Sequence, residues 1–333
     1  MDRNVQGPEY EEREFNMVTN VPRTLTRARG SAVKKKLGLV MWIARQEENG
    51  KMREIKFMRR EGSRMFDRWK LAGTVTACFV FAGATSGFAQ ELQKHTWELG
   101  AEISHVKYEE PEMEEDGVMY GIIGSYTYHN GFMFRAEGRF GYGQVDYSSP
   151  VSGTIDGIDD YTLELRGLAG YDVALSKSCL FTPYIGIGYR YLDDDSSGRI
   201  SSTGALAYDR ESNYVYSPIG VRLIADFQNG WSIGGTAEYD FFWWGKQISY
   251  LSGVSPGYND VSNRQTSGYG FRGSLELQKK FTNIHWATEP YIRYWHIDRS
   301  EHFDVTLYGV RIGEGWEPEN KSTEYGINLL IRF

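Results

Sequence analysis

Cysteine, proline and long apolar runs are all scarce in this chain. It has two cysteines in 333 residues, and Cys78 lies in a segment that we expect to be removed, so Cys179 has no disulfide partner. No run of eighteen apolar residues occurs, which excludes a helical membrane span. Only 9 prolines stand beside 38 glycines and 23 tyrosines, and this balance favours many alternating strands over helices or disorder.

Positive charge is concentrated at the front of the chain. Residues 1–64 carry 15 Lys+Arg against 9 Asp+Glu and show no persistent helix or strand pattern. When that +6, and the +1 of residues 65–89, are subtracted from the total of −7, residues 90–333 have a net charge of −14. Nucleic-acid binding requires a basic surface, so we expect no nucleic-acid partner.

Residues 65–89 have the three parts of a secretory signal. A basic start precedes an apolar run over 71–82, and small residues lead up to Ala89. We therefore predict a signal peptide at 65–89, cleavage after Ala89, and a mature domain at 90–333. The upstream extension 1–64 is not expected in the mature protein, because translation from Met65 would explain the late position of the signal.

Two alternatives to this boundary remain open. Residues 75–78 could form a lipoprotein cleavage box, but the apolar segment continues through Cys78 instead of ending there. Residues 1–64 could also be a functional basic extension in the cytoplasm.

The last nine residues alternate between two kinds of side chain. Large apolar residues occupy every second position: Tyr325, Ile327, Leu329, Ile331 and Phe333. Mostly small or polar residues lie between them, so one face of a strand is apolar. This ending resembles the terminal strand of bacterial outer-membrane proteins, whose last residue is typically Phe, and it implies recognition by the barrel-assembly machinery. An ordinary amphipathic edge strand is the alternative.

The same alternation recurs along the whole domain. Nine earlier segments show it, near 97–104, 118–128, 132–140, 161–171, 181–191, 219–223, 231–243, 269–277 and 286–294. Apolar and charged residues on opposite faces of so many strands are typical of a barrel in lipid, because a soluble barrel has its apolar face inside. We predict an all-β fold, a ten-stranded antiparallel up-and-down transmembrane β-barrel.

Connections of two kinds are expected in turn. Those near 130, 176, 228 and 282 are short, whereas those near 112, 152, 202, 255 and 309 are longer and polar. Asn130-Gly131 is a typical tight hairpin turn. Short periplasmic turns opposite long outer loops predict the outer membrane of a Gram-negative bacterium, with both termini in the periplasm.

The inward positions carry many charges but no lysine. The predicted lumen network comprises Glu98, Glu102, Arg135, Glu137, Arg139, Glu164, Arg166, Arg190, Arg222, Glu238, Asp240, Arg272, Glu276, Glu289 and Arg293. Arginine suits a confined interior because its planar group binds carboxylates at two points. In a barrel this narrow we expect the network to plug the lumen. A charged constriction that passes small polar solutes, as in a narrow porin, is the alternative.

The predicted barrel resembles the omptins, a family of outer-membrane aspartyl-type proteases. The likeness is topological and is best over 216–294, where Pro-Ile-Gly-Val at 218–221 precedes Trp-Ser-Ile-Gly-Gly-Thr-Ala-Glu-Tyr at 231–239. It implies an Asp pair on one wall and an Asp-x-His dyad on the other, with a water between them. Only Asp146 stands where the pair is expected, and residues 241–245, directly after Asp240, contain no His, so the dyad is missing.

Other residues could in principle supply such chemistry. The candidates near the loop end are His296, Asp298, His302, Asp304, Asp193 and Asp194. Histidines and acids in loops are usually only solvated, so we predict no catalytic site. The run from Asp193 begins like a calcium loop, but Gly204 occupies the place of the bidentate Glu. We expect no metal and no cofactor.

Together these observations predict a non-enzymatic outer-membrane barrel whose surface loops interact with the outside. Its expected partners are outer-membrane lipid, lipopolysaccharide and the assembly machinery. The narrow porin and an omptin-like protease remain the alternatives, and the sequence names no external ligand.

Overall fold

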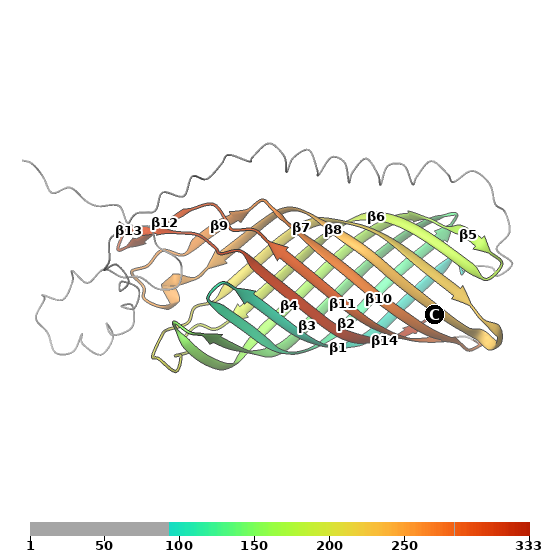
Figure 1. Cartoon of the computed structure of the whole chain (residues 1–333), viewed down its shortest axis with the longest axis horizontal. Coiled ribbons are helices and arrows are strands. Elements are labelled where there is room, and N and C mark those ends of the chain that lie inside the picture. Colours follow the sequence, from blue (N-terminus) through green and yellow to red (C-terminus); the bar gives the residue numbers. More distant parts are fainter. Residues whose placement is uncertain (1–92, 283) are drawn as a thin grey trace, which may run out of the picture.

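The computed structural model describes residues 93–282 and 284–333, which form one long barrel of tilted strands (Figure 1). Its strands are β1 (His95–Glu110), β2 (Met113–Asn130), β3 (Phe132–Ser149), β4 (Gly153–Tyr171), β5 (Val173–Ser176), β6 (Cys179–Asp195), β7 (Arg210–Asp226), β8 (Trp231–Ser249), β9 (Val261–Gln265), β10 (Gly268–Lys280), β11 (His285–Ile297), β12 (Phe303–Leu307), β13 (Val310–Gly315) and β14 (Asn320–Arg332). None of the helical turns in these two ranges is long and apolar enough to cross a membrane. The predicted extension and signal peptide lie outside the described residues.

Ten antiparallel strands close the barrel, which confirms the predicted fold class. Around the barrel the order is β10, β11, β14, β1, β2, β3, β4, β6, β7 and β8, and β8 pairs with β10. β5 follows β4 after Asp172 and, like β4, pairs with β6. β9 precedes β10 and, like β10, pairs with β8. β12 and β13 form a separate hairpin at the loop end.

The two faces of the wall differ as the alternation predicts. On the outside, Leu99 is 59% exposed and Leu275 is 64% exposed. On the inside, Glu102 and Glu238 are 4% and 5% exposed. Successive side chains of a strand point to opposite faces, so a single register places most large apolar groups outward and the charges inward.

The last strand closes the wall at the turn end. Residue Ile331 of β14 lies opposite Leu99 of β1, and the backbones of Phe333 and Trp97 exchange hydrogen bonds of 2.9 and 3.0 Å. Figure 1 shows the C-terminus at this end and the β12–β13 hairpin at the other. The terminal aromatic residue is therefore part of the seam.

The expected long connections near 112 and 152 are wrong. β1 runs to Glu110 and β2 begins at Met113, so only two residues separate them. β3 and β4 are likewise joined by residues 150–152. A strand in water can be polar on both faces, so the acidic segment after Glu109 continues the ladder instead of leaving it. The connections near 202, 255 and 309 are long.

Candidate functional site

The interior network begins at the turn end, around the closing strand. Arg332 in β14 donates two parallel hydrogen bonds to Glu276 in β10, with N···O distances of 2.6 and 2.7 Å. It also pairs with Glu98 in β1. The Glu98 carboxylate accepts a further bond of 2.7 Å from Arg135 in β3. Because Arg332 contacts Glu276 at two points, the positions of both side chains are fixed. The cluster joins the four strands β1, β3, β10 and β14.

Farther into the barrel, ion pairs connect distant parts of the wall. Arg272 in β10 donates to Glu164 in β4 at 2.8 Å and to Asp240 in β8 at 2.9 Å. Arg166 in β4 pairs with Glu238 in β8. Two strands lie between β4 and β8, and three lie between β4 and β10. These contacts therefore pass through the lumen instead of following the wall.

A third cluster lies on the side of the seam. Arg139 in β3 donates to Glu102 in β1 at 2.6 Å and pairs with Glu324 in β14. Arg293 in β11 donates to the same Glu324 at 3.1 Å. Glu324 is absent from the predicted network, because the last strand was expected to begin one residue later. Glu324 and Arg332 are an even number of positions apart in one strand, so their side chains share a face. This spacing was the signal that would have placed Glu324 inside.

The predicted lumen residues all lie on the inner face. Within the described part of the chain, all of them except Arg190 and Glu289 take part in ion pairs. The Arg190 guanidinium lies over the Trp295 ring, 5.6 Å from its centroid. Glu289 accepts hydrogen bonds from a serine and an asparagine side chain. Arg222 is the most open of these arginines, with 26% of its side chain exposed.

An aromatic cluster follows the charges toward the loop end, and the sequence reasoning missed it. Its buried members are Tyr214, Tyr216, Phe242, Trp295 and Ile297. The Tyr216 and Trp295 rings meet edge to face, with centroids 5.0 Å apart. Tyr216 also donates a hydrogen bond of 2.6 Å to Glu164, so the cluster rests directly on the network. Gly188 leaves room for the ring of Tyr216.

Beyond the aromatic cluster, a second set of charges joins the last loop to the wall. Arg210 in β7 pairs with Glu110 in β1 and with Glu317 in the loop before β14. Gln247 donates a further bond of 2.7 Å to Glu317. Burial, aided by the nearby Glu110 carboxylate, raises the pKa of Glu317 from its ordinary 4.5 to about 7, although Arg210 acts in the opposite direction.

The histidine and aspartate candidates do not form a common site. His296 lies 3.0 Å from Asp298, but its ring packs against outward-facing Tyr269, with centroids 5.2 Å apart. Asp193 and Asp194 follow one another in β6 and therefore point to opposite faces. The dyad-like pair thus lies outside the wall, away from the lumen.

The remaining two candidates belong to the β12–β13 hairpin region. His302 is 3.4 Å from Glu314, and Asp304 pairs with Arg311 at 2.7 Å. Across residues 93–282 and 284–333, no group of three or more His, Cys, Asp or Glu side chains could hold a metal ion. Among the described residues the six candidates therefore lie in three separate pairs and not in one site.

Comparisons with known proteins agree with this architecture. Residues 99–247 match the model of the autotransporter beta-domain family. That segment runs from β1 into β8 and has apolar residues outside and charges inside. The chain is an outer-membrane β-barrel protein. It is accordingly placed in the outer membrane of a Gram-negative bacterium. No curated protein matches the chain.

Several solved barrels are similar at low identity. The translocator domain of autotransporter NalP from Neisseria meningitidis is 10% identical, with a TM-score of 0.37, over 79% of this chain and 95% of that one. For Neisserial surface protein A the values are 11%, 0.29, 71% and 95%. For the Pseudomonas putida toluene transporter TodX they are 10%, 0.30, 74% and 91%.

Proposed function

We propose that this outer-membrane protein is a sealed, non-enzymatic barrel that presents an ordered loop end outside the cell. The observation that carries the proposal is the layering of the interior. Ion pairs between distant strands are followed, toward the loop end, by the buried aromatic cluster around Tyr216 and Trp295. A hydrated solute would have to break several buried ion pairs and displace these rings to pass.

The orientation and partners follow the usual rule for such barrels. Short turns lie in the periplasm and longer loops outside, and ten strands place both termini on the turn side. We therefore propose periplasmic termini and a loop end among lipopolysaccharide. The strand that ends at Phe333 would bind the barrel-assembly machinery.

Planar-bilayer conductance tests the sealed barrel. Protein purified from outer membranes is expected to give no reproducible ohmic steps. A double variant, Tyr216→Ala with Trp295→Ala, removes the large rings of the aromatic cluster and serves as the comparison, with more frequent current steps expected. Regular steps from the unmodified protein would contradict the proposal and establish the narrow porin.

The absence of an enzymatic function needs its own experiment. Folded protein is incubated with a fluorogenic peptide library, and no cleavage above the background is expected. Cleavage that His296→Ala or His302→Ala abolishes would instead establish an omptin-like protease with displaced catalytic groups.

A further inference from the structure

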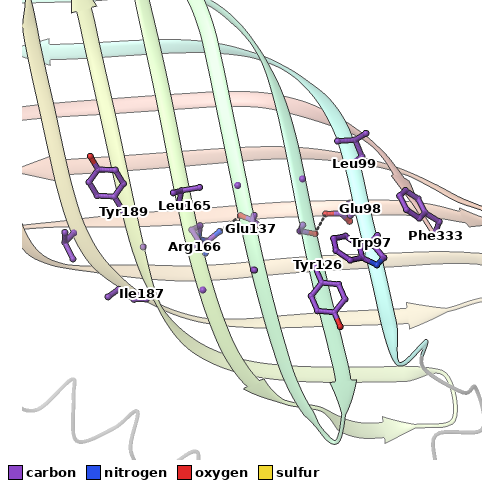
Figure 2. Close-up of a pocket in the computed structure, with 17 residues that line it drawn as sticks. Trp97, Glu98, Leu99, Tyr126, Glu137, Leu165, Arg166, Ile187, Tyr189 and Phe333 are labelled. Atoms are coloured by element: carbon purple, nitrogen blue, oxygen red, sulfur yellow. Dashed lines mark hydrogen bonds and ion pairs between the residues drawn. The ribbon is translucent and has the colours of Figure 1, made fainter.

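The outer face of the barrel has a hollow near its turn end, called here the outer hollow. Its floor consists of four small residues on three adjacent strands: Gly124, Ala136, Gly138 and Gly167. In the register of the sheet, Gly124 lies beside Gly138, and Ala136 lies beside Gly167. Large side chains surround this floor, including Trp97, Leu99, Tyr126, Leu165 and Ile187 (Figure 2). The hollow has a volume of about 870 Å³.

Packing within the barrel does not require these glycines. Among the described residues, no atom lies within 4 Å of a Cβ placed at Gly167, and the nearest atom to one at Gly138 is 3.5 Å away. At Gly188 on the inner face, by contrast, a Cβ would lie 2.1 Å from the Tyr216 ring. The inner glycine makes room for a neighbouring side chain of the same molecule. The outer ones leave a space that a different molecule can occupy.

The chemistry of the outer hollow admits hydrocarbon. Its surrounding side chains are apolar or aromatic, and Leu99, Leu165 and Ile187 are all more than half exposed. The floor is sheet backbone whose polar groups are already paired along β2, β3 and β4. The hollow is continuous with the apolar belt that faces the membrane, and its size is within the roughly 300–1,000 Å³ of ligand sites in proteins.

Two nitrogen-bearing side chains lie beyond the lining of the outer hollow on its turn-end side, where they contact Tyr126 and Tyr128. The His95 ring is 2.7 Å from the Tyr126 hydroxyl, and its plane stacks on the Tyr126 ring. The Lys94 ammonium lies over the ring of Tyr128, 5.7 Å from its centroid. Both precede Trp97 in the chain, at the level where the apolar belt ends. This edge offers a positive charge and hydrogen-bond donors to an anionic headgroup.

We propose that the outer hollow binds one phospholipid, with an acyl chain on the glycine floor and the phosphate at Lys94 and His95. The inference rests on the proposed periplasmic position of the turn end, because phospholipid rather than lipopolysaccharide then surrounds that edge. It assigns a binding site on the lipid-facing wall, separate from the lumen.

Native mass spectrometry of the full chain, released from nanodiscs that contain phosphatidylglycerol, tests the site. The unmodified protein is expected to retain one phospholipid. Gly138→Leu fills the floor and should lower that occupancy at least tenfold. Gly273→Leu is the matched control, since Gly273 also faces outward, on β10 across the barrel, with its nearest contact at 3.7 Å. The control should retain the lipid.

Further variants separate the acyl chain from the headgroup. Gly167→Leu repeats the test at a second floor position in case Gly138→Leu fails to fold. Lys94→Gln combined with His95→Gln should lower the occupancy severalfold while the heat-dependent gel mobility of the folded barrel stays unchanged. These measurements use no conductance, so a leaky barrel would leave the lipid proposal standing.

Four results would overturn the proposal. The unmodified protein could retain no lipid, or Gly138→Leu and Gly273→Leu could retain it equally. Lipid A could be retained in place of phospholipid, which would refute the assigned leaflet. Lastly, a dimer that Gly138→Leu dissociates would show that a second copy of the chain fills the hollow.

Discussion

At the scale of single residues, Gly188 shows how closely the inner wall is packed. A Cβ at this position would lie 2.1 Å from the ring of Tyr216, which is fully buried and bonded to both Glu164 and Arg272. The ring cannot withdraw without losing those bonds. Gly188→Ala is therefore expected to destabilise the barrel by about 1–3 kcal/mol, as overpacking of a filled core does. Urea unfolding in detergent, followed by tryptophan fluorescence, measures the change.

Gly167→Ala provides the control for that measurement. Gly167 lies in a neighbouring strand but faces outward, with no atom of the described chain within 4 Å of an added Cβ. Its unfolding midpoint should stay near that of the unmodified protein. Equal losses at both positions would mean that glycine in these strands matters for its backbone and not for the space beside Tyr216.

The pKa of Glu317 predicts a pH dependence of the last loop. Its carboxyl is 1% exposed and its pKa is raised from 4.5 to about 7 by burial, so the ordered loop binds the proton more tightly than the opened loop does. The ordered state is therefore weakened as the pH rises from about 4.5 to 7, and the effect is complete above 7. Hydrogen exchange of residues 298–319 should show more frequent opening at pH 8 than at pH 5.

Two substitutions isolate this carboxyl. Glu317→Gln keeps the hydrogen-bonding shape without the titration, so the pH dependence of loop opening should flatten. Glu319→Gln removes an exposed carboxyl two residues away and should leave it intact. A slope that survives Glu317→Gln would assign the titration to another group.

At the scale of the strands, alternation predicts the faces well and the ends poorly. It places the charged side chains inside because period two is a local property of extended backbone. Tyr214 and Tyr216 lie an even number of positions from the inward-facing Arg222. The same rule would therefore have placed them inside if the predicted strand at 219–223 had been extended toward its N-terminus. The connections near 112 and 152 were predicted too long, because polar residues on both faces of a strand in water resemble a loop.

The seam of the barrel makes a prediction about its last residue. Phe333 contributes backbone hydrogen bonds to Trp97, which Phe333→Ala preserves, and a half-exposed ring, which it removes. If the ring serves recognition by the assembly machinery, the assembled amount in cells should fall severalfold, while refolding of the purified protein into detergent stays near normal. Fractionation of outer membranes and the heat-dependent gel mobility of the barrel measure the two outcomes.

Deletion of Phe333 is the complementary change. It removes the backbone bonds as well as the ring, so refolding in detergent should slow in addition to the loss in cells. If Phe333→Ala lowers both yields equally, the ring stabilises the seam and the recognition role is wrong.

At the scale of the whole molecule, the shape of the closed barrel decides which arginine pairs with which carboxylate in the lumen. Arg139 and Glu324 are 185 positions apart in the sequence. They meet because β14 lies beside β1 in the closed barrel and because the strands are tilted. Tilt and stagger are properties of closure and not of any one strand. The sequence could therefore predict that inward arginines and carboxylates pair, but not which ones do so.

The network also predicts that lumen arginines differ greatly in their effect on stability. Arg139 is 5% exposed and binds two buried carboxylates, Glu102 and Glu324, which would then have only the single guanidinium of Arg293 between them. Arg139→Met should therefore destabilise the barrel by about 3–5 kcal/mol, as the breaking of buried ion pairs does. Arg222 is more open, and its one partner Glu276 keeps Arg332, so Arg222→Met should cost well under half as much. Urea unfolding in lipid vesicles compares the two. Equal losses would mean that the arginines stabilise the wall through packing of their stems, and the paired network would then not be what holds distant strands together.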